Sequence, residues 1–547
     1  MFLKKTKKQE QSEELRELEE KIINEAENPY GNITDKVISQ VTDDPFSFPD
    51  KKEISDKEVK PEKKVKPEKE LKPEKKTKKK SNREFAIITY LFVSLFVGLI
   101  AYFAYFQVYV ADDFINNSYN SRLASFTESV IRGSILTADN EVLAETVVDS
   151  SGNETRSYPY RNLFSHVVGY STMGNSGLEN SENVHLLSSH VNFVEKAVSD
   201  VTEEKTLGDN VVTTLEYDLQ YAAYNSLGGE KGAVVVLDVE TGKVLAMVSK
   251  PDFDPNTLEE NWDAIVEDAN SESVLYNRAI LGKYPPGSTF KILTALEYIR
   301  EHSDDYEDYS YTCTGKISDG VNDLSCYSGE VHGKVDLKTS FAESCNTSFA
   351  NIGLSLNINK YKKTCEELLF NTTLPTNDFT ATTSSFSLDS SSGTSVIMAT
   401  AIGQGETLVS PIHMAMIAAA IDNDGVLMTP YLVDHIENAN GDLVSSNSPT
   451  KYGSLMTETE ASILKEYMAA VVEEGTGTKL KGLSYDAYGK TGTAEYSDEG
   501  DSHAWFVGFA HQEGKNDIAI AVVVEGAGLG SSYAVPIAKD VFNAYYN

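Results

Sequence analysis

A serine and a lysine three residues apart could together perform covalent chemistry in this 547-residue chain. They are Ser288 and Lys291, within the segment Pro285–Lys291 (PPGSTFK). At the start of a helix, residues three apart lie on one face, so the amine of Lys291 can approach the hydroxyl of Ser288. Serine becomes a nucleophile when a base takes its proton, and lysine can be that base when burial or nearby positive charge lowers its pKa. The pair therefore indicates nucleophilic catalysis.

The Ser-x-x-Lys spacing alone is weak evidence. Ser448 with Lys451 and Ser462 with Lys465 have the same spacing, and both are expected at the surface. Two further motifs follow Ser288 in order, and their arrangement with it favours a shared site. Ser344-Cys345-Asn346 begins 56 residues after Ser288, and Lys490-Thr491-Gly492-Thr493 begins 146 residues after Ser344.

The second motif can serve proton transfer and substrate binding. The hydroxyl of Ser344 can relay a proton between a leaving amine and Lys291. The side chain of Asn346 can hold an amide group of the substrate. We therefore expect Ser344 and Asn346 to lie beside Lys291.

The third motif lies in a predicted strand. Lys490 can attract a terminal carboxylate and lower the pKa of Lys291. The hydroxyls of Thr491 and Thr493 can bind that carboxylate, and Gly492 lets a substrate backbone approach the strand edge. The backbone N–H groups of Ser288 and Thr493 would form an oxyanion hole.

Patterns for several other chemistries are missing from the sequence. It has no His-Glu-x-x-His, no paired metal-spaced cysteines and no Gly-x-Ser-x-Gly elbow. Gly489-Lys490-Thr491 resembles the end of a phosphate-binding loop, but Ser484 stands where the required glycine would be. We therefore expect no metal and no cofactor.

The charges divide the chain at an apolar segment. Residues 85–111 carry no charge and are long enough to span a bilayer as a helix. Six lysines and one arginine lie between Lys72 and Arg83, whereas Asp112 and Asp113 follow the segment. The positive-inside rule places residues 1–84 in the cytoplasm and residues 112–547 outside, on a single-pass membrane protein.

The two sides of this segment differ in composition. The tail, residues 1–84, has 22 basic and 20 acidic residues, and its Lys-Pro-Glu-Lys repeat over 60–77 predicts a disordered spacer. Residues 11–24 could form a short helix, either solvated or bound to a partner helix. The rest of the chain has 26 basic and 63 acidic residues, which argues against nucleic acid as a partner.

The hydrophobic pattern beyond residue 211 predicts an α/β domain. Residues 232–239 and 244–248 read as a hairpin, and residues 288–301 as a helix. Three strands are expected near the end, followed by a helix over 533–545; these strands are 487–494, 504–511 and 517–525. Because a helical region separates the two groups, the sheet is expected to combine strands from both ends of the domain.

The three motifs in this order are typical of β-lactamases and penicillin-binding proteins. Over residues 112–547 the chain resembles a class B penicillin-binding protein, a monofunctional peptidoglycan transpeptidase. Supporting segments occur in family order: Arg132-Gly133, His166–Tyr170, Gly177–Glu179, Asp252–Asn256, Gly403–Gly405 and Trp505–Gly508. One departure is Ala138–Glu141, where the family usually has Asp-Arg-Asn-Gly.

The resemblance implies four parts. They are a cytoplasmic tail (1–84), a transmembrane helix (85–111), an extracellular α+β pedestal of the dimerisation type (112–205) and a transpeptidase domain (206–547). The last part should contain a five-stranded antiparallel sheet flanked by helices, with a helical insert.

The resemblance also implies an activity. Ser288 would attack the penultimate D-alanine carbonyl of a peptidoglycan stem peptide, release the terminal D-alanine and pass the acyl group to a neighbouring amine. β-Lactams would acylate the same serine, no cofactor would be needed, and a SEDS-family glycosyltransferase would be the partner. The alternatives are a membrane-anchored serine β-lactamase and a β-lactam sensor.

The four cysteines leave several possibilities. Cys313 and Cys326 are expected to form a disulfide in the oxidising exterior. Cys345 and Cys365 could pair or remain buried thiols. A catalytic role for Cys345 is disfavoured because Ser288 already has its lysine.

Overall fold

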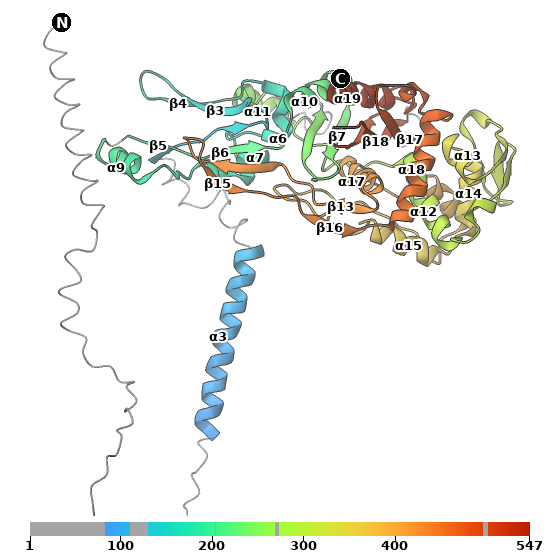
Figure 1. Cartoon of the computed structure of the whole chain (residues 1–547), viewed down its shortest axis with the longest axis horizontal. Helices are drawn as coiled ribbons and strands as arrows, with labels where there is room; N and C mark the ends of the chain where they lie inside the picture. The colour runs from blue at the N-terminus through green and yellow to red at the C-terminus, as the bar shows by residue number, and fades with distance from the viewer. Residues whose placement is uncertain (1–82, 110–128, 203, 268–272, 496–501) are drawn as a thin grey trace, which may run out of the picture. The chain divides into compact units, whose positions relative to one another are not determined.

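The computed structural model describes residues 83–109, 129–202, 204–267, 273–495 and 502–547 (Figure 1). The predicted spacer repeat and the possible helix over 11–24 lie outside these described residues.

The apolar segment forms one helix, α3 (Arg83–Tyr109). Its window Ile87–Phe106 has 20 residues and a mean hydropathy of 2.3, and none of it is buried. A helix of this length and composition can cross the hydrocarbon core of a bilayer.

The predicted transpeptidase domain (206–547), the catalytic half of the chain, is organised around a five-stranded sheet in the order β17-β18-β19-β7-β8, with every neighbouring pair antiparallel. The strands are β7 (Gly232–Asp238), β8 (Val244–Lys250), β17 (Asp486–Ala494), β18 (His503–His511) and β19 (Ile518–Val524). This confirms the predicted sheet built from both ends of the domain. The strand bounds lie within two residues of the predicted ones.

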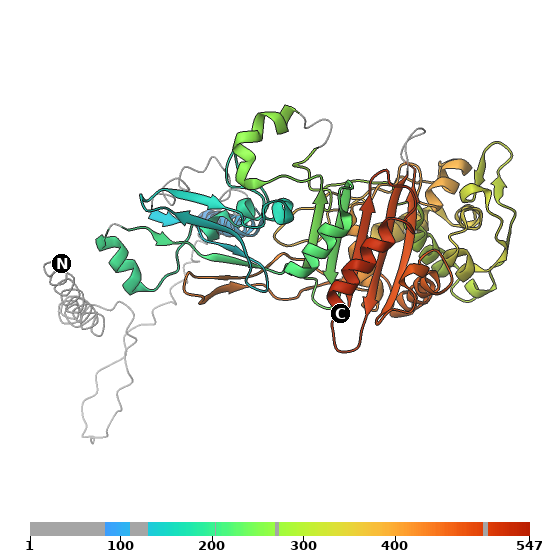
Figure 2. The same cartoon turned by 90° about the horizontal axis from the view of Figure 1, so that it is seen from above.

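Helices cover both faces of this sheet. On one face, α10 (Tyr217–Leu227) and α19 (Ala534–Tyr546) lie side by side over the strands (Figure 2). On the other face lies α17 (Pro411–Asp422), whose residues are all buried. The side chains of β19 alternate between the two cores, so Ile520 packs with α19 while Ala521 packs with the α17 side.

The insert between β8 and β17 is mainly helical. Its helices are η2 (Pro255–Thr257), α11 (Leu258–Glu267), η3 (Gly287–Phe290), α12 (Lys291–Glu301), η4 (Tyr306–Asp308), η5 (Tyr327–Gly329), α13 (Leu337–Ala342), α14 (Asn346–Ser355), α15 (Ile358–Glu367), α16 (Thr394–Ala401), α17, α18 (Glu458–Glu473) and η6 (Thr478–Leu480). Its short strands are β9 (Tyr311–Cys313), β10 (Lys316–Ser318), β11 (Asp323–Ser325), β12 (Gly333–Val335), β13 (Val426–Met428) and β16 (Lys451–Ser454). They form the antiparallel pairs β9–β12, β10–β11 and β13–β16.

The pedestal contains a six-stranded sheet in the order β15-β14-β6-β2-β3-β4. Its early strands are β2 (Ile135–Leu136), β3 (Val142–Val148), β4 (Glu154–Ser157) and β6 (Asn210–Thr213). Two late strands, β14 (Val433–Glu437) and β15 (Leu443–Ser446), complete the sheet through pairing of β14 with β6. The sequence pattern had not indicated this return of the chain to the pedestal.

The other pedestal elements are short. They are β1 (Val130–Ile131), η1 (Arg161–Phe164), α6 (Ser165–Val168), α7 (Gly177–Ser181), α8 (Asn183–Leu186), α9 (Phe193–Thr202) and β5 (Thr206–Leu207). The expected turn between β2 and β3 is present, and Asn140 adopts a left-handed φ of 65° in it.

A buried carboxylate joins two of the pedestal segments that resemble the family, Arg132-Gly133 and Gly177–Glu179. Glu179 on α7 is fully buried, and its oxygens lie 2.6 Å from Arg132 Nε and 2.7 Å from Arg156 Nε. The hydroxyl of Tyr158 donates to it at 3.1 Å. Burial alone would raise the pKa of Glu179, but Arg156 and Arg132 outweigh burial and hold the pKa below its ordinary value.

We predict that Glu179→Gln destabilises the pedestal, because two buried guanidinium groups lose their counter-charge. The free energy of local opening should fall by about 3 kcal/mol, measured by hydrogen exchange on pedestal peptides of the detergent-solubilised full chain. Glu154→Gln is the control, since Glu154 forms a partly exposed pair with Lys205 at 2.7 Å and should lose at most about 1 kcal/mol. Equal effects of the two substitutions would contradict the prediction.

Candidate active site

Ser288 and Lys291 lie where the short helix η3 continues into α12. Ser288 is half-buried in η3, and Lys291, the first residue of α12, is completely buried. The turn before Ser288 is tied to the central sheet, because the indole nitrogen of the buried Trp505 on β18 donates to the carbonyl of Pro285 at 3.1 Å. The serine is thus accessible on a fixed turn while its lysine is enclosed.

The amine of Lys291 joins the first motif to the second. It donates to the backbone oxygen of Ser344 at 2.6 Å, to Ser344 Oγ at 3.1 Å and to Asn346 Oδ1 at 2.7 Å. The structure therefore brings Lys291, Ser344 and Asn346 together, as expected from the motif order.

Ser344 occupies a constrained turn between α13 and α14. Its φ is +59°, a left-handed conformation that is uncommon for a residue with a side chain. The backbone N–H of Ser344 donates to Phe341 and that of Cys345 donates to Ser340, at 3.2 and 2.9 Å. The side-chain amide of Asn346 donates to the carbonyl of Ser325 at 3.2 Å. These bonds hold the second motif in place.

The third motif lies on β17, which is the edge strand of the five-stranded sheet. A Cβ atom on Gly492 would lie 3.0 Å from the Pro286 oxygen and 2.9 Å from Trp505 Cβ. Gly492 is thus required for packing of β17 against the serine turn, a reason that differs from the predicted approach of substrate. The hydroxyls of Thr491 and Thr476 are 2.5 Å apart, a contact that sequence spacing did not indicate.

The two lysines share a low-dielectric environment. Burial lowers the pKa of Lys291 to about 7. Burial also lowers the pKa of Lys490, and the charge of Lys291 lowers it further. Each amine faces an aromatic ring: Lys291 lies 5.4 Å from the centre of Phe349, and Lys490 lies 5.6 Å from that of Phe341. Lys490 had been expected to lower the pKa of Lys291, but burial is the main cause at Lys291.

Two glycines form a close backbone contact that supports the serine turn. Gly287 has a φ of +53°, and its N–H donates to the carbonyl of Gly403 at 2.9 Å. A Cβ atom on Gly403 would lie 2.0 Å from the Gly287 oxygen. In the sequence, Gly403 stands out only as part of a segment that resembles the family. The contact shows that a residue 115 positions after Ser288 fixes its turn.

The two other Ser-x-x-Lys pairs, called decoys because they share only the spacing, lie at the surface, as predicted. Ser448 and Ser462 are exposed. Lys465 forms an ion pair with Asp422 at 2.5 Å. The lysine of this decoy is therefore held by a carboxylate.

The predicted Cys313–Cys326 disulfide is not formed in the structure, and Cys345 and Cys365 are buried thiols, the second of the two possibilities left open: all four cysteines are free and buried. Cys313 Sγ and Cys326 Sγ are 3.7 Å apart, which is too far for a bond of about 2.05 Å. Cys345 lies near Cys326, and Cys365 lies apart on α15. Together with His332, the first three cysteines form a group whose ligand atoms lie within 4.8 Å of one another and could hold a metal ion.

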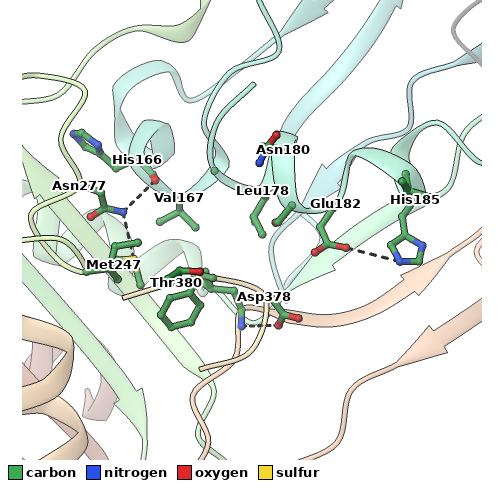
Figure 3. A pocket seen from close by; sticks show the side chains of 16 residues that line it. His166, Val167, Leu178, Asn180, Glu182, His185, Met247, Asn277, Asp378 and Thr380 are labelled. Atoms are coloured by element: carbon green, nitrogen blue, oxygen red, sulfur yellow. Dashed lines mark hydrogen bonds and ion pairs between the residues drawn. The ribbon is translucent and has the colours of Figure 1, made fainter. Parts of the chain in front are cut away.

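A pocket of about 810 Å³ lies where pedestal segments meet the catalytic half (Figure 3). His166, Leu178 and Glu182 line it from one side, and Asn277 and Asp378 from the other. Its 16 lining residues include none of the predicted catalytic or substrate-binding residues. The resemblance segments around His166 and Leu178 thus lie at this junction.

This geometry suits acyl transfer. A half-buried serine precedes a buried amine that is neutral for a substantial fraction of the time near pH 7, and that amine contacts a hydroxyl and an amide. An edge strand with a lysine and two threonines packs against the serine turn.

Comparison with known proteins agrees with this geometry. Residues 232–543 match the family described as "Penicillin binding protein transpeptidase domain", and residues 132–211 match "Penicillin binding protein A dimerisation domain". The peptidoglycan D,D-transpeptidase PbpA of Mycolicibacterium smegmatis is 31% identical over 477 residues, covering 81% of this chain and 95% of the relative.

Two solved structures extend the likeness. The D,D-transpeptidase domain of a peptidoglycan glycosyltransferase from Eggerthella lenta is 33% identical with a TM-score of 0.67, covering 76% of this chain and 97% of that one. Penicillin-binding protein A from M. tuberculosis, solved as a penicillin G acyl-enzyme, is 27% identical with a TM-score of 0.69, covering 77% and 100%. The chain therefore belongs to the class B penicillin-binding proteins, a family of serine D,D-transpeptidases.

Proposed function

We propose that Ser288 is the nucleophile with which this D,D-transpeptidase crosslinks the stem peptides of bacterial peptidoglycan. The observation that carries the proposal is the buried amine of Lys291, whose pKa is about 7 and which contacts both Ser344 and Asn346. Such an amine can take a proton from serine near neutral pH.

The reaction has two stages. In the first, neutral Lys291 accepts the Ser288 proton while Ser288 Oγ bonds to the penultimate D-alanine carbonyl. The carbon–nitrogen bond to the terminal D-alanine then breaks, and the proton returns through Ser344 to the leaving amine. In the second, an amine from a neighbouring peptide attacks the ester carbonyl, and its proton passes through Lys291 to Ser288 Oγ as the carbon–oxygen bond to Ser288 breaks.

The edge strand β17 supplies the proposed substrate contacts. Its outer edge can pair with an extended peptide, a common mode of recognition. Lys490 with the hydroxyls of Thr491 and Thr493 would bind the terminal carboxylate. The backbone N–H groups of Ser288 and Thr493 would stabilise the oxyanion. β-Lactams would acylate Ser288 through the same contacts.

We also propose the arrangement of the chain in the cell membrane. Residues 1–84 would lie in the cytoplasm, residues 85–111 would span the bilayer, and residues 112–547, which hold the pedestal and the transpeptidase domain, would lie outside. The lysine cluster before the apolar helix supports this orientation. A SEDS-family glycosyltransferase is the proposed partner, because crosslinking requires glycan strands that another membrane enzyme polymerises.

We predict that Ser288→Ala abolishes covalent labelling of the full-length protein by fluorescent penicillin, because the acylated oxygen is removed. Ser462→Ala, in a surface decoy of the same spacing, should label like the wild type on denaturing gels. Labelling that survives Ser288→Ala would refute the proposed nucleophile. Release of the label within minutes would instead favour a β-lactamase, whereas a transpeptidase should retain it for hours.

The acylation rate should depend on pH through Lys291. A base must be neutral, so the second-order rate constant for penicillin should rise as pH increases through about 7 and then level off. Lys291→Arg should lower this constant by roughly 10²- to 10⁴-fold and remove the rise, because a guanidinium stays protonated. Stopped-flow measurements between pH 5.5 and 9 provide the test, and a flat wild-type profile would contradict the role of Lys291.

Gly403→Ala should displace the serine turn, because the new Cβ would clash with the Gly287 oxygen. The acylation rate constant should fall roughly 10- to 100-fold, as expected for a misplacement of about 1 Å. Gly405→Ala is the matched control: its φ of +85° is similar to the +76° of Gly403, but no atom lies within 4 Å of the added Cβ. The two variants should therefore share the conformational strain and differ in acylation; equal rates would argue against the contact.

A further inference from the structure

Four potential metal ligands meet beside the second catalytic motif. Cys313 ends β9, Cys326 precedes η5, His332 precedes β12, and Cys345 is the residue before α14. Intervals of 13, 6 and 13 residues separate them along the chain. Pairing of β9 with β12 places Cys313 opposite Gly333, the neighbour of His332, which explains how this distant pair meets.

The distances fit a tetrahedral ion. Cys326 Sγ lies 3.7 Å from Cys313 Sγ and 3.8 Å from Cys345 Sγ, and His332 Nδ1 lies 3.4 Å from Cys313 Sγ. A zinc ion with Zn–S bonds of about 2.3 Å and a Zn–N bond of about 2.0 Å places neighbouring sulfurs about 3.8 Å apart, and sulfur and nitrogen about 3.5 Å apart. Three of the six edges of a zinc tetrahedron are thus already present, and all four ligand atoms lie within 4.8 Å of one another.

Burial and neighbouring groups support a closed site. The three cysteines are at most 3% exposed, and the His332 side chain is 6% exposed. The N–H of Gly315 and the hydroxyl of Thr347 donate to Cys313 Sγ at 3.4 and 3.2 Å. On the far side of the imidazole, Glu330 lies 3.8 Å from His332 Nε2. This is an ion-pair distance and not a hydrogen bond; a carboxylate that moved onto the second ring nitrogen would be a common support for a metal-bound histidine.

A disulfide explains this arrangement less well. Cys326 is almost equally close to two sulfurs, and any pairing among three cysteines leaves one thiol over. A disulfide would also give the neighbouring His332 no function. Three thiolates and an imidazole form one of the usual structural zinc sets, and soft sulfur ligands favour zinc over calcium or magnesium.

We propose that Cys313, Cys326, His332 and Cys345 bind one structural zinc ion. Binding would displace three thiol protons and leave a Cys₃His centre with all four positions filled by protein. The centre would therefore have no open position for catalysis. It would lie outside the acyl-transfer chemistry of Ser288.

The proposed ion would act on the active site by holding its second motif. Cys345 stands between Ser344 and Asn346, which both contact Lys291. The segment that supplies the other three ligands also accepts a hydrogen bond from Asn346 at Ser325. Zinc would thus fasten this segment to the start of α14 and position Ser344 and Asn346. This positioning role, unlike the metal binding itself, rests on the proposed function.

Metal content tests the site directly. The full-length protein, purified in detergent without chelators, should contain about one zinc ion per chain when its metal content is measured by inductively coupled plasma mass spectrometry. Cys326→Ala should lower the zinc content more than about tenfold, while Cys365→Ala, which removes a buried thiol outside the cluster, should leave it unchanged. Ser288→Ala should also keep its zinc, so the outcome is independent of the nucleophile. Little zinc in the wild type, unchanged zinc in Cys326→Ala, or another metal at full occupancy would overturn the proposal.

Two measurements on the wild type remain decisive if Cys326→Ala fails to fold. Exchange of the ion for Co²⁺ should give the intense visible absorption of tetrahedral cobalt and a thiolate charge-transfer band; weak octahedral bands would overturn the ligand set. Alkylation after unfolding in a chelator should modify all four cysteines. Modification of only two would show a disulfide and overturn the site.

The positioning role has a separate readout. Removal of zinc should slow the acylation step by penicillin while leaving the dissociation constant of the preceding noncovalent complex little changed, and Zn²⁺, but not Mg²⁺, should restore the rate. An unchanged acylation rate in zinc-free protein would refute the positioning role. It would leave both the metal site and the assignment of Ser288 intact.

Discussion

The structure of the catalytic half depends on keeping the amine of Lys291 out of water. A buried ammonium is costly, and here the amine is accommodated by three oxygen acceptors from Ser344 and Asn346. These acceptors exist only because the chain turns through a left-handed residue between α13 and α14. The cost of burial lowers the pKa of Lys291 and so makes the amine available as a base. The same desolvation therefore destabilises the protonated form of Lys291 and makes its neutral amine available as a base.

The five-stranded sheet fixes the serine turn next to the buried Lys291 through contacts from two of its strands. Trp505 on β18 bonds the turn at Pro285, and Gly492 on β17 allows the strand to pack against it. Gly403 holds the same turn from the side of the insert. Because three separate segments hold Ser288, its position is set by the core and not by the flexibility of a loop. Preorganisation of this kind lowers the reorganisation required during the reaction.

Local patterns in the sequence predicted the main strands of the sheet and the three motifs of the candidate site. The valine-rich runs over 232–248 and 518–524 gave the strands, and the spacing of Ser288, Lys291, Ser344 and Lys490 gave the motifs. Contacts between distant segments carried no local signal: the pairing of β14 with β6, the contact of Gly403 with Gly287, and the meeting of His332 with three cysteines. The cysteine intervals match no short metal-binding pattern, because the ligands converge through strand pairing and not through one turn.

The completion of the pedestal sheet by β14 imposes an order on how the protein is made. Asn210 on β6 and its partner Glu437 on β14 are 227 residues apart in the chain. As the polypeptide emerges from its N-terminal end, β6 is available long before β14, so one edge of the pedestal sheet stays unpaired while most of the insert is synthesised. The pedestal cannot mature as an independent unit ahead of the enzyme; both become complete only when the late part of the chain has been synthesised.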